Sequence, residues 1–207
     1  KMTQWSMRIT AFAERLLKGL ESLDWTDSVK DIQKNWIGKS QGSTALFNLE
    51  GFEEKIEVFT TRPDTIFGVS FMVLAPEHPL VQKITTPDQK EKVEKYQKAA
   101  GGKSERERMS DVKTISGEFT GAFAIHPFSG RKIQVWIGDY VLASYGTGAV
   151  MAVPCGDQRD WDFAKHFNIE VVNIFKDKNI SDGAYVEKDA IITNSEFLND
   201  LPVKKAI

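Results

Sequence analysis

The sequence predicts an α/β fold: a compact mixed or antiparallel sheet that curls towards a barrel and is flanked by helices. Segments with the residue pattern of strands are separated by short turns, which favours antiparallel neighbours. Strand-like and helix-like segments do not alternate in the regular order that a doubly wound parallel sheet requires. The chain has 207 residues, 41% of them hydrophobic and 27% charged, and is long enough to bury a core of its own.

Composition and charge exclude several classes of protein. The net charge of −2 is not the electrostatic footprint of a protein that holds nucleic acid by itself. The single cysteine, Cys155, excludes an internal disulfide framework and fits a reducing compartment. The histidines, at positions 78, 126 and 166, stand far apart and offer no metal site. No apolar run has transmembrane length and no signal-peptide pattern is evident, so we expect a cytoplasmic protein without a metal ion.

The N-terminal segment is predicted to be helical. Apolar residues recur at helical spacing between Trp5 and Leu23, and a second helix is expected to begin near Asp27 or Ser28. Two short helices cannot bury such large apolar faces against each other alone, so we expect them to belong to a larger body. We place a boundary after residue 36, with the main domain over residues 37–200. Residues 201–207 resemble the start of an unfinished helix, which suggests a fragment of a longer protein.

The main domain contains the predicted strands and turns. Pro63 fixes a polar turn over residues 60–65, and Ser129-Gly130 joins two strands as a hairpin. A solvated helix is expected over residues 87–100, ended by the pair Gly101-Gly102. The predicted strands are Ala45–Leu49, Lys55–Thr60, Val69–Leu74, Phe119–Ile125, Lys132–Ile137, Glu170–Phe175 and Ile191–Thr193.

The stretch from Tyr145 to Phe167 is the most informative part of the sequence. A glycine-rich turn is followed by a short apolar strand, Ala149–Val153, and then by the charged cluster Asp157–Asp160, which opens an amphipathic helix. Carboxylates at the junction between a strand and the following helix are suited to binding a small polar group. The same acids also fit a purely structural role. Asp157 is a good N-cap, and Asp160 lies three residues on, close to a capping box with Asp in place of Glu or Gln. Acids in a first turn also suit the helix dipole. The spacing alone favours the structural role, and the functional one stays open.

Two motifs in this order resemble a known family. The segment TTRPDTIFG (60–68), together with YGTGAVMAVP and DQRDWDFA within 145–164, is similar to the editing domain of bacterial-type leucyl-tRNA synthetases. Further similar segments extend the resemblance over essentially the whole chain, and two long motifs are more specific than either alone. The valyl type usually has Asp-Pro-Asn-Asp in the later cluster, and the isoleucyl type has Pro-Trp-Thr in the threonine-rich motif. Both differences favour the leucyl type.

The resemblance implies a fold, an activity and partners. The fold would be the editing-domain fold of the valyl, isoleucyl and leucyl synthetases, with residues 1–36 leading in from the catalytic body and 201–207 starting the return segment. The activity would be hydrolysis of the ester that joins isoleucine, norvaline or a similar amino acid to tRNA(Leu). The aminoacylation motifs of the family are missing, so ATP and Mg would be used only by the parent catalytic domain, and this chain would need no cofactor. The expected partners are the acceptor end of tRNA(Leu) and the rest of the synthetase; we expect a monomer and no membrane contact.

The resemblance also implies roles for residues. Asp160 would bind the α-amino group of the misattached amino acid, and Thr65 would exclude leucine by its branched side chain. Thr60, Thr61 and Arg62 would contact the terminal adenosine and the ester, where they would hold a water molecule or stabilise the oxyanion. From the residues alone, Thr65 would equally suit a turn.

The remaining expectations concern the pocket and the nucleophile. Tyr145, Met151, Val153 and Asp157 would line the pocket, although Met151 and Val153 would otherwise be interpreted as core residues. No Ser-His-Asp or Cys-His pattern is evident, so we expect direct attack by water, assisted by the free ribose hydroxyl. The family commonly has His where this chain has Gly156, which predicts weaker or differently tuned editing. The alternative function is a non-catalytic module that docks the tRNA acceptor end.

Overall fold

The computed structural model describes residues 5, 7–110, 114–144 and 146–207. The chain divides into two compact units, Lys1–Gln41 and Gly42–Ile207. None of the helices in the described ranges is both long and apolar enough to cross a bilayer.

The first unit is helical, as the apolar spacing predicts. It consists of the 3-10 turn η1 (Ile9–Phe12), α1 (Ala13–Gly19), η2 (Leu20–Ser22) and α2 (Asp27–Ile37). The left-handed backbone of Gly38 ends α2, and an ion pair of 3.0 Å joins Lys39 to Glu14. The apolar faces remain largely exposed, with Trp36 85% and Ile32 60% accessible.

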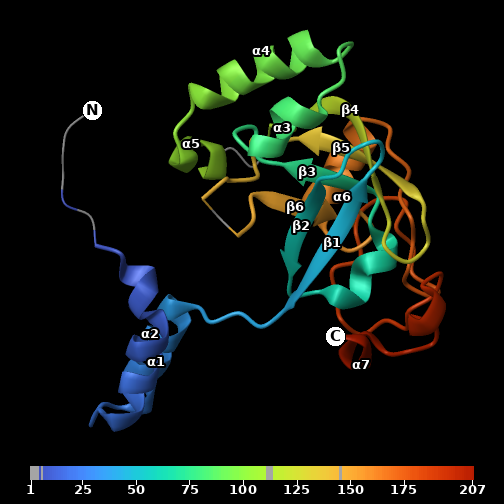
Figure 1. The fold of residues 1–207 in the computed structure, drawn as a ribbon. Helices are drawn as coiled ribbons and strands as arrows, with labels where there is room; N and C mark the ends of the chain where they lie inside the picture. The colour runs from blue at the N-terminus through green and yellow to red at the C-terminus, as the bar shows by residue number, and fades with distance from the viewer. Residues whose placement is uncertain (1–4, 6, 111–113, 145) are drawn as a thin grey trace. The chain divides into compact units, whose positions relative to one another are not determined.

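The second unit is built on a six-stranded sheet that confirms the predicted fold class. Its strand order is β2-β1-β4-β5-β3-β6, and every neighbouring pair is antiparallel except β3 and β5. The edge strands β2 and β6 also contact each other, so the sheet curls into a nearly closed barrel (Figure 1). The strands are β1 (Ser43–Leu49), β2 (Lys55–Thr60), β3 (Phe71–Leu74), β4 (Glu118–Ile125), β5 (Lys132–Ile137) and β6 (Ala149–Ala152).

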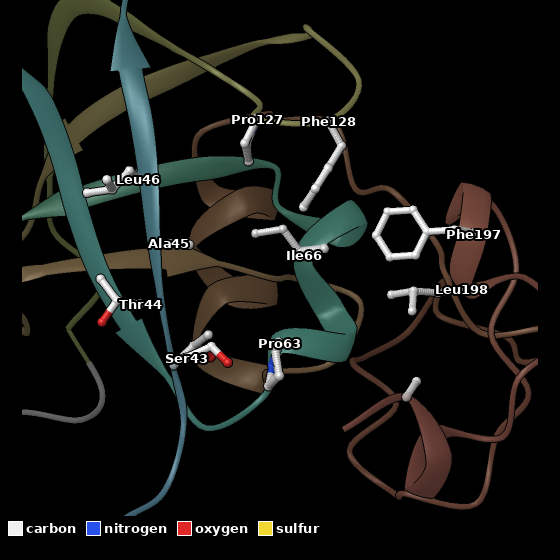
Figure 2. Close-up of a pocket in the computed structure, with 12 residues that line it drawn as sticks. Ser43, Thr44, Ala45, Leu46, Pro63, Ile66, Pro127, Phe128, Phe197 and Leu198 are labelled. Atoms are coloured by element: carbon white, nitrogen blue, oxygen red, sulfur yellow. The ribbon is translucent and has the colours of Figure 1, made fainter.

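Helices and 3-10 turns surround this sheet. In Figure 1, α3, α4 and α5 gather above the sheet, and Figure 2 shows η3 lying between β1 and the C-terminal segment that carries Phe197 and Leu198. Their bounds are η3 (Pro63–Gly68), α3 (Pro79–Ile84), α4 (Lys90–Gly101), α5 (Glu105–Ser110), α6 (Gln158–His166), η4 (Glu196–Leu198) and α7 (Val203–Ala206).

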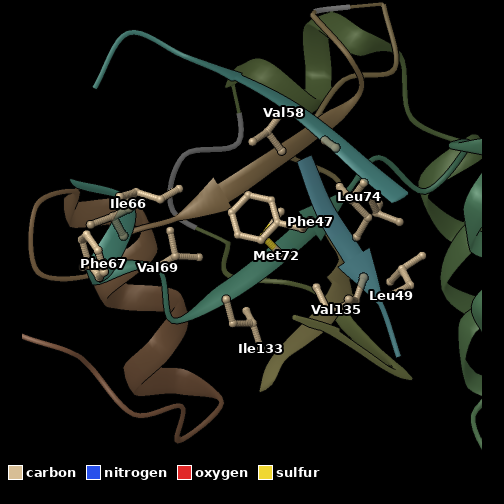
Figure 3. Close-up of a cluster of buried hydrophobic side chains, with 14 of the residues drawn as sticks. Phe47, Leu49, Val58, Ile66, Phe67, Val69, Met72, Leu74, Ile133 and Val135 are labelled. Carbon is tan, nitrogen blue, oxygen red and sulfur yellow. The ribbon is translucent and has the colours of Figure 1, made fainter. Parts of the chain in front are cut away.

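The main core fills the inside of the curled sheet. Side chains alternate along a strand, so every second residue of β1 and β2 points inward. Figure 3 shows Phe47 and Met72 at the centre of this cluster, and both are fully buried. The other inward side chains include Leu49, Ile56, Val58, Leu74, Ile133 and Val135.

A second cluster covers the opposite face of β3, β5 and β6 and fixes the position of α6. Phe71 of β3 stacks on Phe163 of α6, with ring centroids 4.8 Å apart, and Trp136 packs edge-on against the same ring. Because both faces of β3 are covered, its residues are all buried and show no alternation in burial. This packing holds the first turn of α6 beside the end of β6, where the acidic cluster lies.

Some predicted elements differ from the structure. Glu170–Phe175 and Ile191–Thr193 are not strands, and only the isolated bridges Phe175–Ile192 and Ile191–Pro202 form there. Side-chain hydrogen bonds replace the backbone hydrogen bonds between strands. The Asn173 side chain accepts a hydrogen bond from the Phe175 N–H and donates one to the Lys178 carbonyl. Helix α3 was not predicted from the sequence.

Candidate active site

The threonine-rich motif is tied together by its own side chains. The Thr60 hydroxyl oxygen accepts from the Arg62 N–H at 3.0 Å, and the Thr65 hydroxyl donates to the Arg62 carbonyl at 2.9 Å. The Arg62 guanidinium donates two hydrogen bonds, of 2.9 and 2.8 Å, to the carboxylate of Asp64. Asp64 is fully buried and Thr65 is 4% exposed. The second half of the predicted polar turn thus belongs to the 3-10 helix η3, in which Asp64 and Thr65 are buried.

A histidine fixes the end of this motif to the β4–β5 hairpin. His126 Nε2 lies 3.0 Å from the Ile66 carbonyl, while Nδ1 accepts from the N–H groups of Phe128 and Ser129. These partners require a neutral ring with its proton on Nε2. Burial lowers the pKa of His126, which favours the same neutral form. The side chain is 1% exposed and acts as a structural tie.

The acidic cluster is organised by the start of α6. Asp157 caps the helix, because its Oδ1 accepts from the N–H groups of Arg159 and Asp160 at 2.9 and 3.2 Å. Asp160 does not complete a capping box. Its Oδ2 accepts instead from the Val153 N–H at 2.8 Å, across the loop that joins β6 to α6. Oδ1 of Asp160 accepts no hydrogen bond from the described residues.

The environment of Asp160 disfavours its charged form. Burial, followed by the negative charge of Asp157, raises the pKa of Asp160 from 3.8 to about 8. The Val153 N–H and the Arg159 guanidinium oppose this shift but do not cancel it. A positive group that arrived beside the carboxyl would therefore ionise it, because it would offset both the desolvation and the repulsion.

Both aspartates line one cavity of about 500 Å³. This volume lies in the range of small-molecule sites, and the wall combines apolar side chains with a few charged groups. Met151 of β6 supplies part of the apolar wall. The full set of described lining residues is Tyr140, Val141, Leu142, Val150, Met151, Asp157, Arg159 and Asp160.

The two motifs meet where β3 pairs with β6. The Ser70 N–H donates to the Ala152 carbonyl at 3.0 Å. A Cβ added to Gly68 would lie 3.1 Å from both the Cys155 sulfur and a Val153 methyl group, so a larger residue at position 68 would push the motifs apart.

The predicted site residues do not all line the same cavity. Thr60 lines a second cavity of about 410 Å³, between β1, η3 and the aromatic side chains of Phe128 and Phe197 (Figure 2). Thr61, Arg62 and Thr65 are not among the described residues that line the cavity of Asp160. Val153 is buried beside that cavity and contributes its N–H to Asp160. Tyr145 lies outside the described residues.

Several residues that line the cavity were not predicted from the sequence. Tyr140 and Leu142 precede the glycine-rich turn, and Arg159 lies inside the cluster from which only the acids were selected. The only sequence signal that could have indicated these residues is that they lie close to, or within, the recognised motif. In the described part of the chain, no group of three or more His, Cys, Asp or Glu side chains is placed to hold a metal ion.

Comparison with known proteins agrees with this geometry. Residues 34–207 match the family model "Leucyl-tRNA synthetase, editing domain", and the chain belongs to this family. The leucine–tRNA ligases of Christiangramia forsetii and Flavobacterium johnsoniae are 62% and 63% identical over the whole chain. The chain spans 22% of the length of each of these relatives. The resemblance inferred from the two motifs is thus confirmed.

A solved structure shares the fold. It is the crystal structure of the ternary complex of Agrobacterium radiobacter K84 agnB2 LeuRS with tRNA and LeuAMS. The match has a TM-score of 0.71 at 36% sequence identity and covers 88% of this chain and 22% of that chain. The curled sheet with its flanking helices is therefore also found in a leucyl-tRNA synthetase.

Proposed function

We propose that this domain performs post-transfer editing within a leucine–tRNA ligase, by hydrolysing the ester that joins isoleucine, norvaline or a similar amino acid to tRNA(Leu). An apolar synthetic pocket separates amino acids that differ by one methyl group by only ~1–3 kcal/mol, so a second site is needed to remove errors. The observation that carries the proposal is the Asp160 carboxyl. It is held by the Val153 N–H and keeps one oxygen available in a cavity that Met151 and Asp157 also line.

Asp160 is the group that binds the α-ammonium of the misattached amino acid. An ammonium beside Oδ1 forms a charge-assisted hydrogen bond and ionises the carboxyl. Asp157 faces the same cavity and adds negative charge, while its Oδ1 still caps α6. The two interpretations of Asp157, as a helix cap and as a substrate contact, are therefore compatible.

The nucleophile is a water molecule. Its oxygen attacks the ester carbonyl, the bond to the ribose oxygen breaks, and a proton from the water ends on that ribose oxygen. The products are a free amino acid and a tRNA with a free terminal hydroxyl. Cys155 takes no part, because burial raises the pKa of its thiol to about 11 and keeps it protonated near neutral pH.

The threonine-rich motif supplies discrimination and charge stabilisation. Thr65 has its hydroxyl fixed on the Arg62 carbonyl, and one fixed rotamer is what a steric filter against the branched leucine side chain requires. Arg62 uses only some of its N–H donors on Asp64, so others are available for the developing oxyanion. Thr60 and Thr61 would position the terminal adenosine and the water.

The proposal is tested by measuring the deacylation of Ile-tRNA(Leu) and norvalyl-tRNA(Leu). The assay uses this chain and a full-length leucine–tRNA ligase that contains this domain. Asp160→Ala should reduce hydrolysis by about 100-fold, since it removes a partly buried, charge-assisted contact. Asp162→Ala, which removes a partly exposed acid from the same helix, serves as the matched control. Full activity of Asp160→Ala would refute the role of Asp160.

The alternative, a non-catalytic docking module, predicts a different result. It requires binding of the tRNA acceptor end without turnover, even in the full-length enzyme. Turnover in the wild type that Asp160→Ala abolishes would exclude the docking module.

A further inference from the structure

Arg159 is the positively charged group on the wall of the candidate active site. Its side chain lines the cavity together with Asp157 and Asp160. The carbon at the centre of its guanidinium lies 5.5 Å from the centroid of the Tyr140 ring, within the range of a cation–π contact. In the described part of the chain its guanidinium makes no hydrogen bond and no ion pair within 4.0 Å. The N–H donors of Arg159 are therefore available to a ligand.

The Tyr140 ring is a fixed platform for this guanidinium. It packs against Phe163 with ring centroids 6.0 Å apart. It also lies close to Gly138, where an added Cβ would be only 2.9 Å from a ring carbon. A planar guanidinium that rests on such a ring has lost part of its rotational freedom before any ligand arrives.

The cavity thus presents charges of both signs to one ligand. The carboxyls of Asp157 and Asp160 suit a cationic group, and the Arg159 guanidinium suits an anionic one, for which its fork of donors matches phosphate oxygens. An amino acid esterified to the end of a polynucleotide has this combination. Its ammonium is at one end, and the first phosphodiester of the chain lies one nucleoside away.

We propose that Arg159, stacked on Tyr140, binds the phosphodiester that joins the ester-bearing nucleotide to the preceding nucleotide. The inference rests on the proposed editing function and adds a contact to the nucleic-acid backbone. Arg159 is a positioning residue: it holds the strand so that the ester lies beside Asp160, and it takes no part in the chemical step.

The test compares two substrates, norvalyl-tRNA(Leu) and norvalyl-adenosine, the latter without any phosphate. Arg159→Ala should raise the KM for the tRNA roughly ten-fold, the effect of one charge-assisted hydrogen bond, with kcat nearly unchanged. It should leave hydrolysis of norvalyl-adenosine as in the wild type. Arg159→Lys keeps the charge but loses the planar fork of donors. Its KM for norvalyl-tRNA(Leu) should therefore lie between those of the wild type and Arg159→Ala.

Salt dependence gives a second, independent readout. Loss of one phosphate contact should reduce the slope of log KM against log salt by about 0.7, the value for a single strand. Lys165→Ala is the matched control, because Lys165 rests on the Trp161 ring of the same helix, at 5.1 Å, but is not among the residues that line the cavity. Its KM and salt slope should match the wild type.

The outcomes separate this inference from the proposed function. An unchanged KM and salt slope in Arg159→Ala would overturn the phosphate contact while leaving editing in place. An equal loss on both substrates would overturn it too, because the effect would then not depend on phosphate. A wild type that hydrolyses neither substrate, in the chain or in the full-length enzyme, would reject the editing function itself.

Discussion

The two motifs that meet where β3 pairs with β6 are built in opposite ways. In the threonine-rich motif the polar side chains of Thr60, Arg62 and Thr65 are bound to groups of the motif itself. In the acidic motif Asp160 has one oxygen bound and the other available, and burial raises its pKa to about 8. The first arrangement is rigid and settled before a ligand binds. The second is electrostatically unfavourable until a positive group arrives. A steric filter needs the first property, and a binding site for an ammonium needs the second.

The largest expected effect comes from breaking the rigid motif. Asp64 is fully buried and pairs with the largely buried guanidinium of Arg62. Asp64→Ala removes this carboxylate and leaves the guanidinium without its partner. The free energy of unfolding should fall by about 3 kcal/mol, as when one member of a buried ion pair is removed. Urea denaturation measures this change. The control is Glu54→Ala in the exposed pair with Lys83, which should change stability little. Equal effects of the two variants would contradict the contrast between the motifs.

The second prediction concerns discrimination by the same motif. Thr65→Ala removes the branched side chain proposed to exclude leucine and frees the Arg62 carbonyl of a hydrogen bond. Correctly charged Leu-tRNA(Leu) should then be hydrolysed at least about ten-fold faster than by the wild type. Deacylation assays on Leu-tRNA(Leu) and Ile-tRNA(Leu) provide the comparison. If Leu-tRNA(Leu) remained protected, Thr65 would not be the filter.

The third prediction tests the electrostatic state of the acidic motif. The pKa of Asp160 is about 8 in the folded state, against 3.8 without the fold, so the folded state holds this proton more tightly. The contribution of Asp160 to stability is therefore fully present below the unfolded-state pKa of 3.8. It is lost as the pH rises through the folded-state pKa of about 8. Asp160→Asn cannot ionise, so it should lose less stability than the wild type over this window. Thermal or urea unfolding at several pH values measures the free energy of unfolding of both proteins. If this free energy changed with pH in the same way in the wild type and in Asp160→Asn, the raised pKa would be refuted.

The smallest expected effect is at position 156. A Cβ there would meet the Phe175 ring at 3.4 Å, an ordinary contact, so Gly156→His should fold like the wild type. Introducing the histidine that the family resemblance implies at this position should change the rate of hydrolysis of norvalyl-tRNA(Leu) by a few-fold. An identical rate would mean that position 156 does not contribute to editing.

Much of the fold could be predicted from local patterns. The alternation of apolar residues located β2 exactly where the structure has it, and Asp157 was correctly identified as a helix cap. The residues 170–175 were predicted to be a strand, because their composition is strand-like. In the structure the side chains of Ser70 and Asn173 occupy the backbone groups that a ladder would need. Ser70 lies 102 positions from Val172, so its hydrogen bond leaves no signal in a local pattern.

The candidate site was predictable in part. The motif resemblance selected Asp157, Asp160 and Met151, and these residues share one cavity. The spacing of Asp160 suggested a capping box, but its carboxyl is bound by Val153 instead. Arg159 was passed over, because an exposed arginine in the first turn of a helix carries no distinguishing pattern until the ring beneath it is known.

Most strands of the sheet, the start of α6 and the family follow from the sequence alone, because alternation, capping residues and motif spacing are properties of neighbouring residues. The groups that the acids and the arginine face depend on tertiary contacts. The antiparallel pairing of β3 with β6 brings residues about eighty positions apart side by side, as in the pair Phe71–Ala152, while packing on Phe71 and Phe163 fixes α6. Burial and the charge of a neighbouring acid set the pKa of Asp160, and both depend on which groups the fold places around it.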